Sequence, residues 1–567
     1  MLKGELKEER ANKQEISGER DREKKRFSWE AAVGTGLILF LAAVFLVDGI
    51  NTMQYQLLGY DEAYNGSVAA NVMRYGRYRT SYPVRTAFYN LITTGQSVLF
   101  PTGILYRVVG ISNLSSGIVP LLYGTADIFL FWRLLNKCLP DKKIKYILSA
   151  VLTYVILMTD RQFIYTSTRL IGEAAALCFL LAFFVFLLDY HETGKARFMV
   201  LAGAMTAFSF LTKTSMIFFV VSLSGMVFIE TALTKRIKGK GGIGYALGFL
   251  AGIGAMDFYK LQELGGMGRY IRWWKTEWRN MLVQSSGIDT ACNVGEKINY
   301  LKNIFMWNQY FCLALLAVPA AMYLIHVFRC LSGKKKGMSD GMAAAVMAGV
   351  SGSSLPIYFI LLGGKGLMYD RRHAANELMV KFFVAYAAAS LLLALPGLVG
   401  EYRKTHAGGA PGSSGKTGAL PGAGGIAAAA GCLLLLLPAF PLKTIRDSAV
   451  SYIKKSREDS YEQQLMKEFL QEISGLGEEA VLYCGDWWQE PNISLYLNKD
   501  MYSMANVGSI DRENGYFIVG RRFDGANLDY YANLWRVEFE AVDSIEVDYS
   551  RLYSYGSDKL FSIYKIH

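Results

Sequence analysis

Long apolar segments alternate with short polar ones along most of this chain. A transmembrane helix needs about 20 mostly apolar residues, and segments of this kind recur from Ala31 to Leu442. Such repetition favours a polytopic α-helical membrane protein, because helices satisfy their own backbone hydrogen bonds inside a bilayer. The pattern predicts eleven transmembrane helices, at residues 31–50, 114–135, 146–163, 170–190, 197–212, 214–233, 243–262, 306–328, 341–363, 377–400 and 424–441.

The composition supports this class of protein and indicates which kinds of partner to expect. The 567 residues are 52% hydrophobic and 19% charged, with a mean hydropathy of +0.21, which is too apolar for a soluble protein of this size. The net charge of +12 accompanies basic residues clustered in short loops between spans, which is what membrane topology demands. We therefore expect the lipid bilayer as a partner and no nucleic acid.

The basic loops also predict the orientation. Cytoplasmic loops carry an excess of Lys and Arg, so these loops and the basic N-terminal tail, residues 1–30, are placed in the cytoplasm. With eleven spans the C-terminus is then extracytoplasmic, and we expect an integral protein of a bacterial plasma membrane. The basic loops hold Arg133 with Lys137, Lys142, Lys143 and Lys145; Lys195 with Arg197; Lys235, Arg236, Lys238 and Lys240; Arg329 with Lys334, Lys335 and Lys336; and Arg403 with Lys404.

The first external loop, residues 51–113, is predicted to hold two helices that lie on the membrane surface. The second of them, within 95–110, is apolar but short, and segments of about 10–14 apolar residues are more often interfacial than transmembrane. The first is expected to end at Gly76 and to lie in the interface plane. Its apolar stripe at helical spacing consists of Tyr64, Val68, Val72 and Tyr75.

The last part of the chain changes character. Residues 401–425 are rich in Gly, Ser and Pro, which is typical of a flexible linker. Residues 442–567 contain no further span and predict a small extracytoplasmic α/β domain, which is of ordinary domain size. We expect a helix over 456–476 and strands at 480–483, 516–519, 537–540 and 560–564.

Ionisable side chains in or beside the spans are functional candidates, because burying them costs free energy or requires a partner. The topology, derived from the basic loops alone, places several of them on the external side and so predicts one shared site. They are the adjacent carboxylates Asp61 and Glu62 after the first span, Arg169 and Glu173 at the start of the fourth, Lys213 between the fifth and sixth, and Arg371 and Arg372 before the tenth.

Three motifs carry a resemblance to a known family. They are YDEAYNGSVAANVMRYGRY at 60–78, RLIGE at 169–173 and GAMTAFSFLTK at 203–213. Together they resemble the GT-C glycosyltransferases, and within them the polyprenyl- or dolichyl-phosphate-sugar group of protein O-mannosyltransferases, aminoarabinose transferases and RgtA/B/C/D-like proteins. The resemblance covers roughly residues 31–230.

The resemblance implies a membrane enzyme whose catalytic domain spans residues 31–441. Such an enzyme transfers a sugar, with inversion, from a polyprenyl-phosphate donor to a hydroxyl of a glycan, lipid or protein acceptor on the extracytoplasmic face. Asp61 would be the general base, Glu62 would orient the loop or the acceptor, Arg169, Lys213, Arg371 and Arg372 would bind the donor phosphate, and Glu173 would hold Arg169 or bind the sugar. No cofactor is implied and no metal ligand set is evident, although the carboxylates could hold a divalent ion.

The residues leave other interpretations open. Asp61 could serve only as a helix N-cap, and Arg169 and Glu173, four residues apart, could pair with each other. Lys213 could snorkel to the interface, and the arginines at 371 and 372 could contact lipid headgroups. A transporter or flippase for a lipid-linked or anionic substrate, or a non-catalytic cell-envelope assembly protein, would also need charges in these places.

Overall fold

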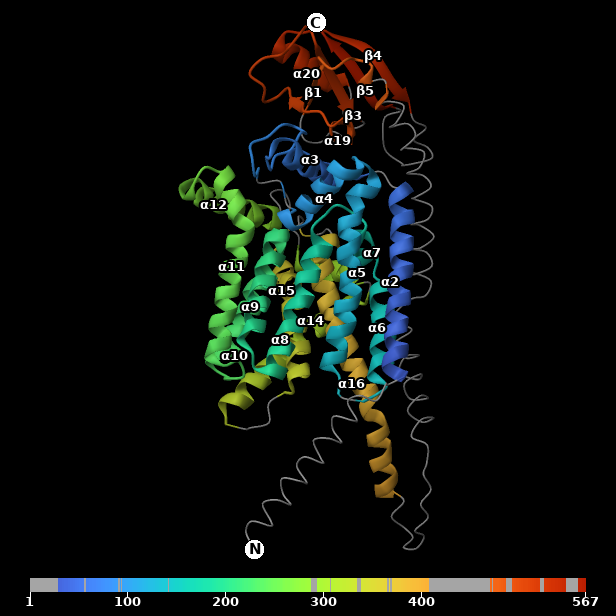
Figure 1. Ribbon diagram of the computed structural model, residues 1–567, viewed down its shortest axis with the longest axis vertical. Coiled ribbons are helices and arrows are strands. Elements are labelled where there is room, and N and C mark those ends of the chain that lie inside the picture. The colour runs from blue at the N-terminus through green and yellow to red at the C-terminus, as the bar shows by residue number, and fades with distance from the viewer. Residues whose placement is uncertain are drawn as a thin grey trace.

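The computed structural model has a helical bundle with a small sheet domain at one end, here called the upper end (Figure 1). It describes residues 29–55, 58–89, 92, 94–140, 142–286, 293–305, 307–333, 338–364, 367, 370–406, 470–471, 473–485, 492–520, 525–546 and 559–567. The predicted span 424–441 and most of the predicted helix 456–476 lie outside these residues.

Each predicted span within the described residues overlaps a helix, but the one over 146–163 is broken in two, and Ala196–Thr212, the predicted span 197–212, is shorter than the candidate spans. Eight helices of the described part are long and apolar enough to cross a membrane, or nine if the bent pair α6–α7 counts as one span. That pair bends by 77° where one helix was predicted over 146–163. The bundle contains α2 (Trp29–Tyr55), α5 (Asn113–Cys138), α6 (Lys145–Met158), α7 (Arg161–Ser167), α8 (Glu173–Thr193), α9 (Ala196–Thr212), α10 (Ile217–Ala232), α11 (Gly239–Glu263), α14 (Gln309–Leu331), α15 (Asp340–Leu361) and α16 (Ala374–His406).

The described residues of the basic clusters lie at the lower end of the bundle, where ion pairs join several helix ends. Lys137, near the end of α5, lies 2.8 Å from Asp189 and 2.7 Å from Glu192, both near the end of α8. Arg236, between α10 and α11, contacts Asp340 at the start of α15. The bundle thus separates these cations from the candidate site residues, which lie at the upper end.

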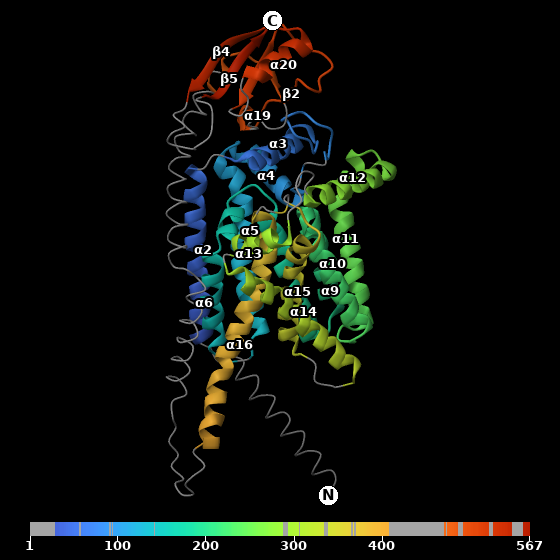
Figure 2. The ribbon, with the colours of Figure 1, turned by 180° about the vertical axis from the view of Figure 1, so that it is seen from behind.

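Two helices cover the upper end, α3 (Tyr60–Tyr75) and α4 (Gln96–Val109) (Figures 1 and 2). As predicted, α3 ends at Gly76, whose φ of 64° is left-handed, and α4 is not among the candidate spans of the described chain. The predicted apolar stripe of α3 is protein-covered rather than lipid-facing, because Tyr64, Val68 and Val72 are buried among residues of α4 and the sheet domain. Tyr75, the last member of the stripe, is exposed.

The sheet domain has five strands in the order β2-β1-β3-β5-β4. The strands β2, β1 and β3 are parallel, and β5 pairs antiparallel with β3 and β4. Four of the strands match the predicted ones, whereas β2, with three residues, was missed. The elements are β1 (Val481–Cys484), α19 (Asn492–Leu497), β2 (Met501–Ser503), β3 (Gly515–Gly520), α20 (Gly525–Trp535), β4 (Phe539–Glu546) and β5 (Lys559–Ile566).

The linker predicted to start at residue 401 was placed too early, because α16 continues to His406. The rest of the predicted linker lies outside the described residues. The remaining elements are the short 3-10 helices η1 (Thr214–Met216) and η3 (Asp370–His373) and the helices α12 (Met267–Ser286) and α13 (Val294–Phe305).

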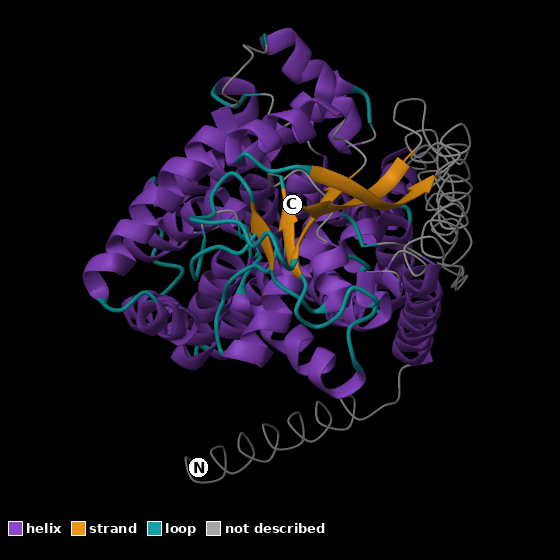
Figure 3. Cartoon of the chain, turned by 90° about the horizontal axis from the view of Figure 1, so that it is seen from above, coloured by secondary structure: helices purple, strands orange, loops and turns teal. Residues whose placement is uncertain are grey.

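The sheet domain docks on the segment that follows α3. The backbone N–H of Val84 donates to Met501 O at 3.0 Å, and Met501 N–H donates to Ser81 O at 2.8 Å, so this segment extends the sheet beyond its edge strand β2. Arg79 and Asp500 form an ion pair of 2.7 Å beside it. Seen from above, the strands lie over the helices of the bundle (Figure 3). The domain therefore covers α3, the helix that carries Asp61 and Glu62.

Candidate active site at the upper end of the bundle

Asp61 and Arg371 contact each other although they are far apart in the sequence. Asp61 lies in the first turn of α3, and Arg371 lies in η3, just before α16. Both side chains are partly exposed, Asp61 to 40% and Arg371 to 30%. The interpretation of Asp61 as an N-cap is wrong, because Gly59 occupies that position and no side chain caps the helix.

Glu62 forms the second ion pair of the site, with Arg169 at 3.6 Å. Both side chains are buried, Glu62 to 2% exposure. A side chain at Gly59 would collide with this carboxylate, since a Cβ there would lie 2.3 Å from Glu62 Oε2. The Arg169 guanidinium also stacks over the ring of Tyr165, 5.2 Å from its centroid.

The third ion pair joins Glu173 and Lys213 at 3.0 Å. The alternative pairing of Arg169 with Glu173 is wrong: each has another ionic partner, and α8 begins only at Glu173, so the two residues are not on one helical turn. Gly172 allows the chain before α8 to lie close to the end of α9, because a Cβ at residue 172 would lie 2.7 Å from Thr212 O.

The three pairs form one cluster. Arg371 interacts electrostatically with Glu173 and Tyr165 as well as with Asp61. Asn65, one turn beyond Asp61, donates to Thr94 Oγ1 at 2.9 Å and to Leu170 O at 2.8 Å. Thr94 in turn forms a backbone bridge with Lys213. The structure therefore brings Asp61, Glu62, Arg169, Glu173, Lys213 and Arg371 together, and Arg372 lies partly buried beside Arg371 in η3.

Sequence reasoning missed a buried charged triad. Lys381 Nζ lies 2.7 Å from Asp160 Oδ2 and 2.5 Å from Glu377 Oε1, and all three side chains are almost fully buried. Asp160 also caps α7 by accepting from Phe163 N–H at 2.7 Å. The triad thus joins α7, which precedes Arg169, to α16, which follows Arg371. Two charges four residues apart inside an apolar span, Glu377 and Lys381, were the available signal.

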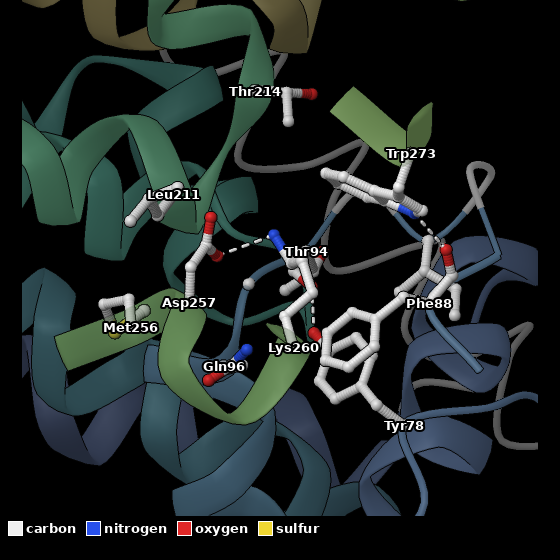
Figure 4. A pocket seen from close by; sticks show the side chains of 12 residues that line it. Tyr78, Phe88, Thr94, Gln96, Leu211, Thr214, Met256, Asp257, Lys260 and Trp273 are labelled. Carbon is white, nitrogen blue, oxygen red and sulfur yellow. Dashed lines mark hydrogen bonds and ion pairs between the residues drawn. The ribbon is translucent and has the colours of Figure 1, made fainter. Parts of the chain in front are cut away.

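A small cavity of about 30 Å³ adjoins the Lys213 turn (Figure 4). Leu211 and Thr214, which flank Lys213, form part of its wall. Lys260, another residue of the wall, pairs with Asp257 at 2.7 Å and lies 4.1 Å from the centroid of the Trp273 ring. The remaining lining residues are Tyr78, Phe88, Ile92, Thr94, Gly95, Gln96 and Met256.

The charge pattern of the site is that of a cation cluster facing carboxylates. Among the described residues, no group of three or more His, Cys, Asp or Glu side chains is arranged to hold a metal ion. Each carboxylate of the cluster instead faces a cation of the chain itself. Arg and Lys side chains are suited to phosphate oxygens, Arg through planar paired hydrogen bonds and Lys as a point charge.

Comparisons with known proteins identify the fold. No protein-family model and no curated protein matches this chain. The crystal structure of ArnT from Cupriavidus metallidurans bound to undecaprenyl phosphate superposes with a TM-score of 0.54 at 12% identity, covering 94% of this chain and 98% of that one. The chain has the GT-C fold. ArnT in the apo state gives a TM-score of 0.51 at 13% identity with the same coverage.

The GT-C fold thus extends well beyond residues 31–230, where the three motifs lie, and confirms the predicted fold class. The oligosaccharyltransferase of Archaeoglobus fulgidus is a further neighbour, with a TM-score of 0.47 at 12% identity, covering 88% of this chain and 69% of that one. ArnT is an aminoarabinose transferase, and both neighbours belong to the GT-C superfamily.

Proposed function

We propose that this chain is a membrane glycosyltransferase that moves a sugar from a polyprenyl-phosphate donor to an acceptor hydroxyl, with Asp61 as general base. The observation that carries the proposal is the exposure of Asp61. Its side chain is 40% exposed, whereas those of Glu62 and Glu173, the other carboxylates of the cluster, are 2% exposed. Only Asp61 among these three is open to an incoming acceptor.

The proposed reaction follows from this arrangement. The acceptor hydroxyl is a weak nucleophile, and a carboxylate within hydrogen-bonding reach accelerates its attack by about 10²–10⁴-fold. The acceptor oxygen bonds to the anomeric carbon from the face opposite the phosphate, so the configuration inverts. Its proton passes to Asp61, and the bond from the anomeric carbon to the phosphate oxygen breaks. The polyprenyl phosphate leaves with the bonding electrons.

The cations of the cluster take the role of phosphate ligands. A guanidinium has five N–H donors, so contact with Asp61 leaves Arg371 able to donate to a phosphate oxygen as well. Arg169 and Lys213 supply further positive charge deeper in the site, and Arg372 lies next to Arg371. The fold supports a ligand of this class, because the ArnT structure with the same fold is bound to undecaprenyl phosphate. Glu62 and Glu173 position Arg169 and Lys213.

The site is proposed to face the extracytoplasmic side. The basic loops of the described part of the chain lie at the lower end of the bundle, and cytoplasmic loops are the ones enriched in Lys and Arg. The acceptor is then a glycan, lipid or protein that is accessible from outside the cell.

The test compares surface glycans by mass spectrometry in cells with and without the gene, and in cells that carry Asp61→Asn. We expect one sugar modification to disappear without the gene and to stay absent with Asp61→Asn. Asp529→Asn, at an exposed aspartate of the sheet domain, should restore it. Unchanged glycans in the deletion strain would refute a glycosyltransferase, and restoration by Asp61→Asn would favour a flippase or an assembly protein instead.

A further inference from the structure

The helix α12 begins where a candidate membrane span ends. The span α11 stops at Glu263, and a turn with Gly265 and Gly266 at φ values of 72° and 118° redirects the chain into α12 at Met267. Figures 1 and 2 show α12 across the upper end of α11, projecting away from the bundle. Because α11 is long and apolar enough to cross a membrane, a bilayer crossed by α11 would have its surface near the start of α12.

The side chains of α12 divide into three faces. The inner face contacts the protein through Tyr270, Trp273 and the buried Glu277. A rotation of about 100° per residue places an apolar face next to it and a basic face beyond that. The apolar face holds Met267, Ile271 and Trp278, which are 57%, 60% and 47% exposed, and the basic face holds the exposed Arg272, Lys275 and Arg279.

This arrangement is typical of a helix that lies in a membrane interface. Such helices bury apolar side chains at the boundary between headgroups and acyl chains and carry Lys and Arg along the adjoining face. Within the described part of the chain, no ion pair joins Arg272, Lys275 or Arg279 to a carboxylate. The only acidic residue of α12, Glu277, is buried on the inner face. The charge left on the basic face fits the anionic headgroups of phospholipids.

The inner face of α12 is connected to the candidate active site. Trp273 Nε1–H donates to Phe88 O, and Trp273 forms part of the wall of the cavity beside the Lys213 turn. The Phe88 ring stacks on Tyr78 with centroids 4.4 Å apart, and Tyr78 OH donates to Thr94 O at 2.5 Å. Thr94 is the residue that bridges to Lys213 and accepts from Asn65 of α3.

We propose that the outer faces of α12 bind anionic phospholipid headgroups, and that this binding holds Trp273 against the cavity beside Lys213. The second part rests on the proposed function, since it makes glycosyl transfer depend on the lipid composition. The first part is a property of the membrane protein whatever reaction it catalyses.

Lipid binding is tested with full-length protein purified from membranes of fixed phosphatidylglycerol and phosphatidylcholine content. Native mass spectrometry counts the phosphatidylglycerol molecules that each chain retains. The variant Arg272→Gln/Lys275→Gln/Arg279→Gln should retain several-fold fewer than wild type. The variant Lys499→Gln/Arg512→Gln/Arg536→Gln, which removes the same charge from the sheet domain, should retain as many as wild type. Equal counts for the α12 variant and wild type would overturn the proposal.

The link to the site is tested by the transfer rate in nanodiscs of increasing phosphatidylglycerol content. The rate of wild type should rise several-fold, and that of the α12 variant should stay flat. A parallel rise in both proteins would refute the link and leave the lipid site standing. Failure of the proposed function has a different signature: wild type would show no transfer at any phosphatidylglycerol content, or Asp61→Asn would transfer as fast as wild type, while the lipid counts of the α12 variant stayed low.

Discussion

The guanidinium of Arg371 contacts the carboxylate of Asp61 at the partly exposed rim of a cluster of ion pairs. The deeper pairs, Glu62 with Arg169 and Glu173 with Lys213, are shielded from solvent. This difference in solvent exposure separates the roles of the three ion pairs. The rim pair can meet a substrate directly, whereas the deeper carboxylates hold cations in place.

The role of Lys213 as a phosphate ligand can be separated from its role as partner of Glu173. Lys213→Ala should weaken use of the polyprenyl-phosphate donor, because a hydrogen bond to a charged group contributes about 1.5–3 kcal/mol, or roughly 10–150-fold. The informative measurement is donor kinetics of the double variant Lys213→Ala/Glu173→Gln. If Lys213 binds phosphate, the double variant stays defective. Recovery of wild-type kinetics would mean that Lys213 serves only to neutralise Glu173.

The buried triad is expected to be a structural anchor for α7 and α16. Lys381→Met leaves Asp160 and Glu377 as unpaired buried carboxylates, and breaking a buried ion pair in this way destabilises by about 3–5 kcal/mol. The thermal unfolding midpoint in detergent should fall clearly, while Lys195→Met, at an exposed lysine of the lower end, should leave it unchanged. The triple variant Lys381→Met/Asp160→Asn/Glu377→Gln should recover much of the lost unfolding midpoint. A midpoint equal to wild type in Lys381→Met would rule out the anchor.

Gly95 controls how closely α4 approaches the Lys213 turn. Its N–H donates to Thr212 O at 2.8 Å, and a Cβ at this position would lie 2.1 Å from Leu211 O and 2.7 Å from Thr212 Cα. Gly95→Ala must therefore push backbone segments apart, and overpacking of this kind costs about 1–3 kcal/mol. We expect a lower unfolding midpoint and reduced transfer. Gly36→Ala, where a Cβ meets nothing within 4 Å, is the matched control, and equal behaviour of the two variants would contradict this role.

The predicted orientation is tested by labelling single cysteines in intact cells with a membrane-impermeant maleimide. Arg512→Cys, in the sheet domain, should react from outside, whereas Lys142→Cys, in a basic loop of the lower end, should react only after the membrane is opened. Both positions are exposed, so accessibility reports the side of the membrane. Labelling of Lys142→Cys in intact cells would contradict the predicted orientation.

Much of the fold could be predicted because hydrophobic periodicity and basic loops are local signals. Most of the described spans, the end of α3 at Gly76 and four of the five strands needed no knowledge of distant contacts. The three-residue strand β2 could not be found, since it forms through pairing with β1 and with the segment around Ser81 and Val84.

The members of the candidate site could also be named from charge at the membrane surface, but their partners could not. Spacing alone suggested that Arg169 pairs with Glu173, which would require both on one helical turn, and α8 starts too late for that. The partners actually found, such as Arg371 for Asp61 and Asp160 for Lys381, are far apart in the chain. Only tertiary packing brings them together.

The central claim, that Asp61 is the general base, is tested most directly by the transfer rate of purified Asp61→Asn with polyprenyl-phosphate-sugar donor and acceptor. The substitution preserves size, and Asp61 caps no helix, so folding and membrane insertion should match wild type. Transfer should fall by about 10²-fold or more, because the amide cannot accept the proton of the acceptor hydroxyl, and Glu62→Gln should be milder. Near wild-type transfer by Asp61→Asn would contradict the account.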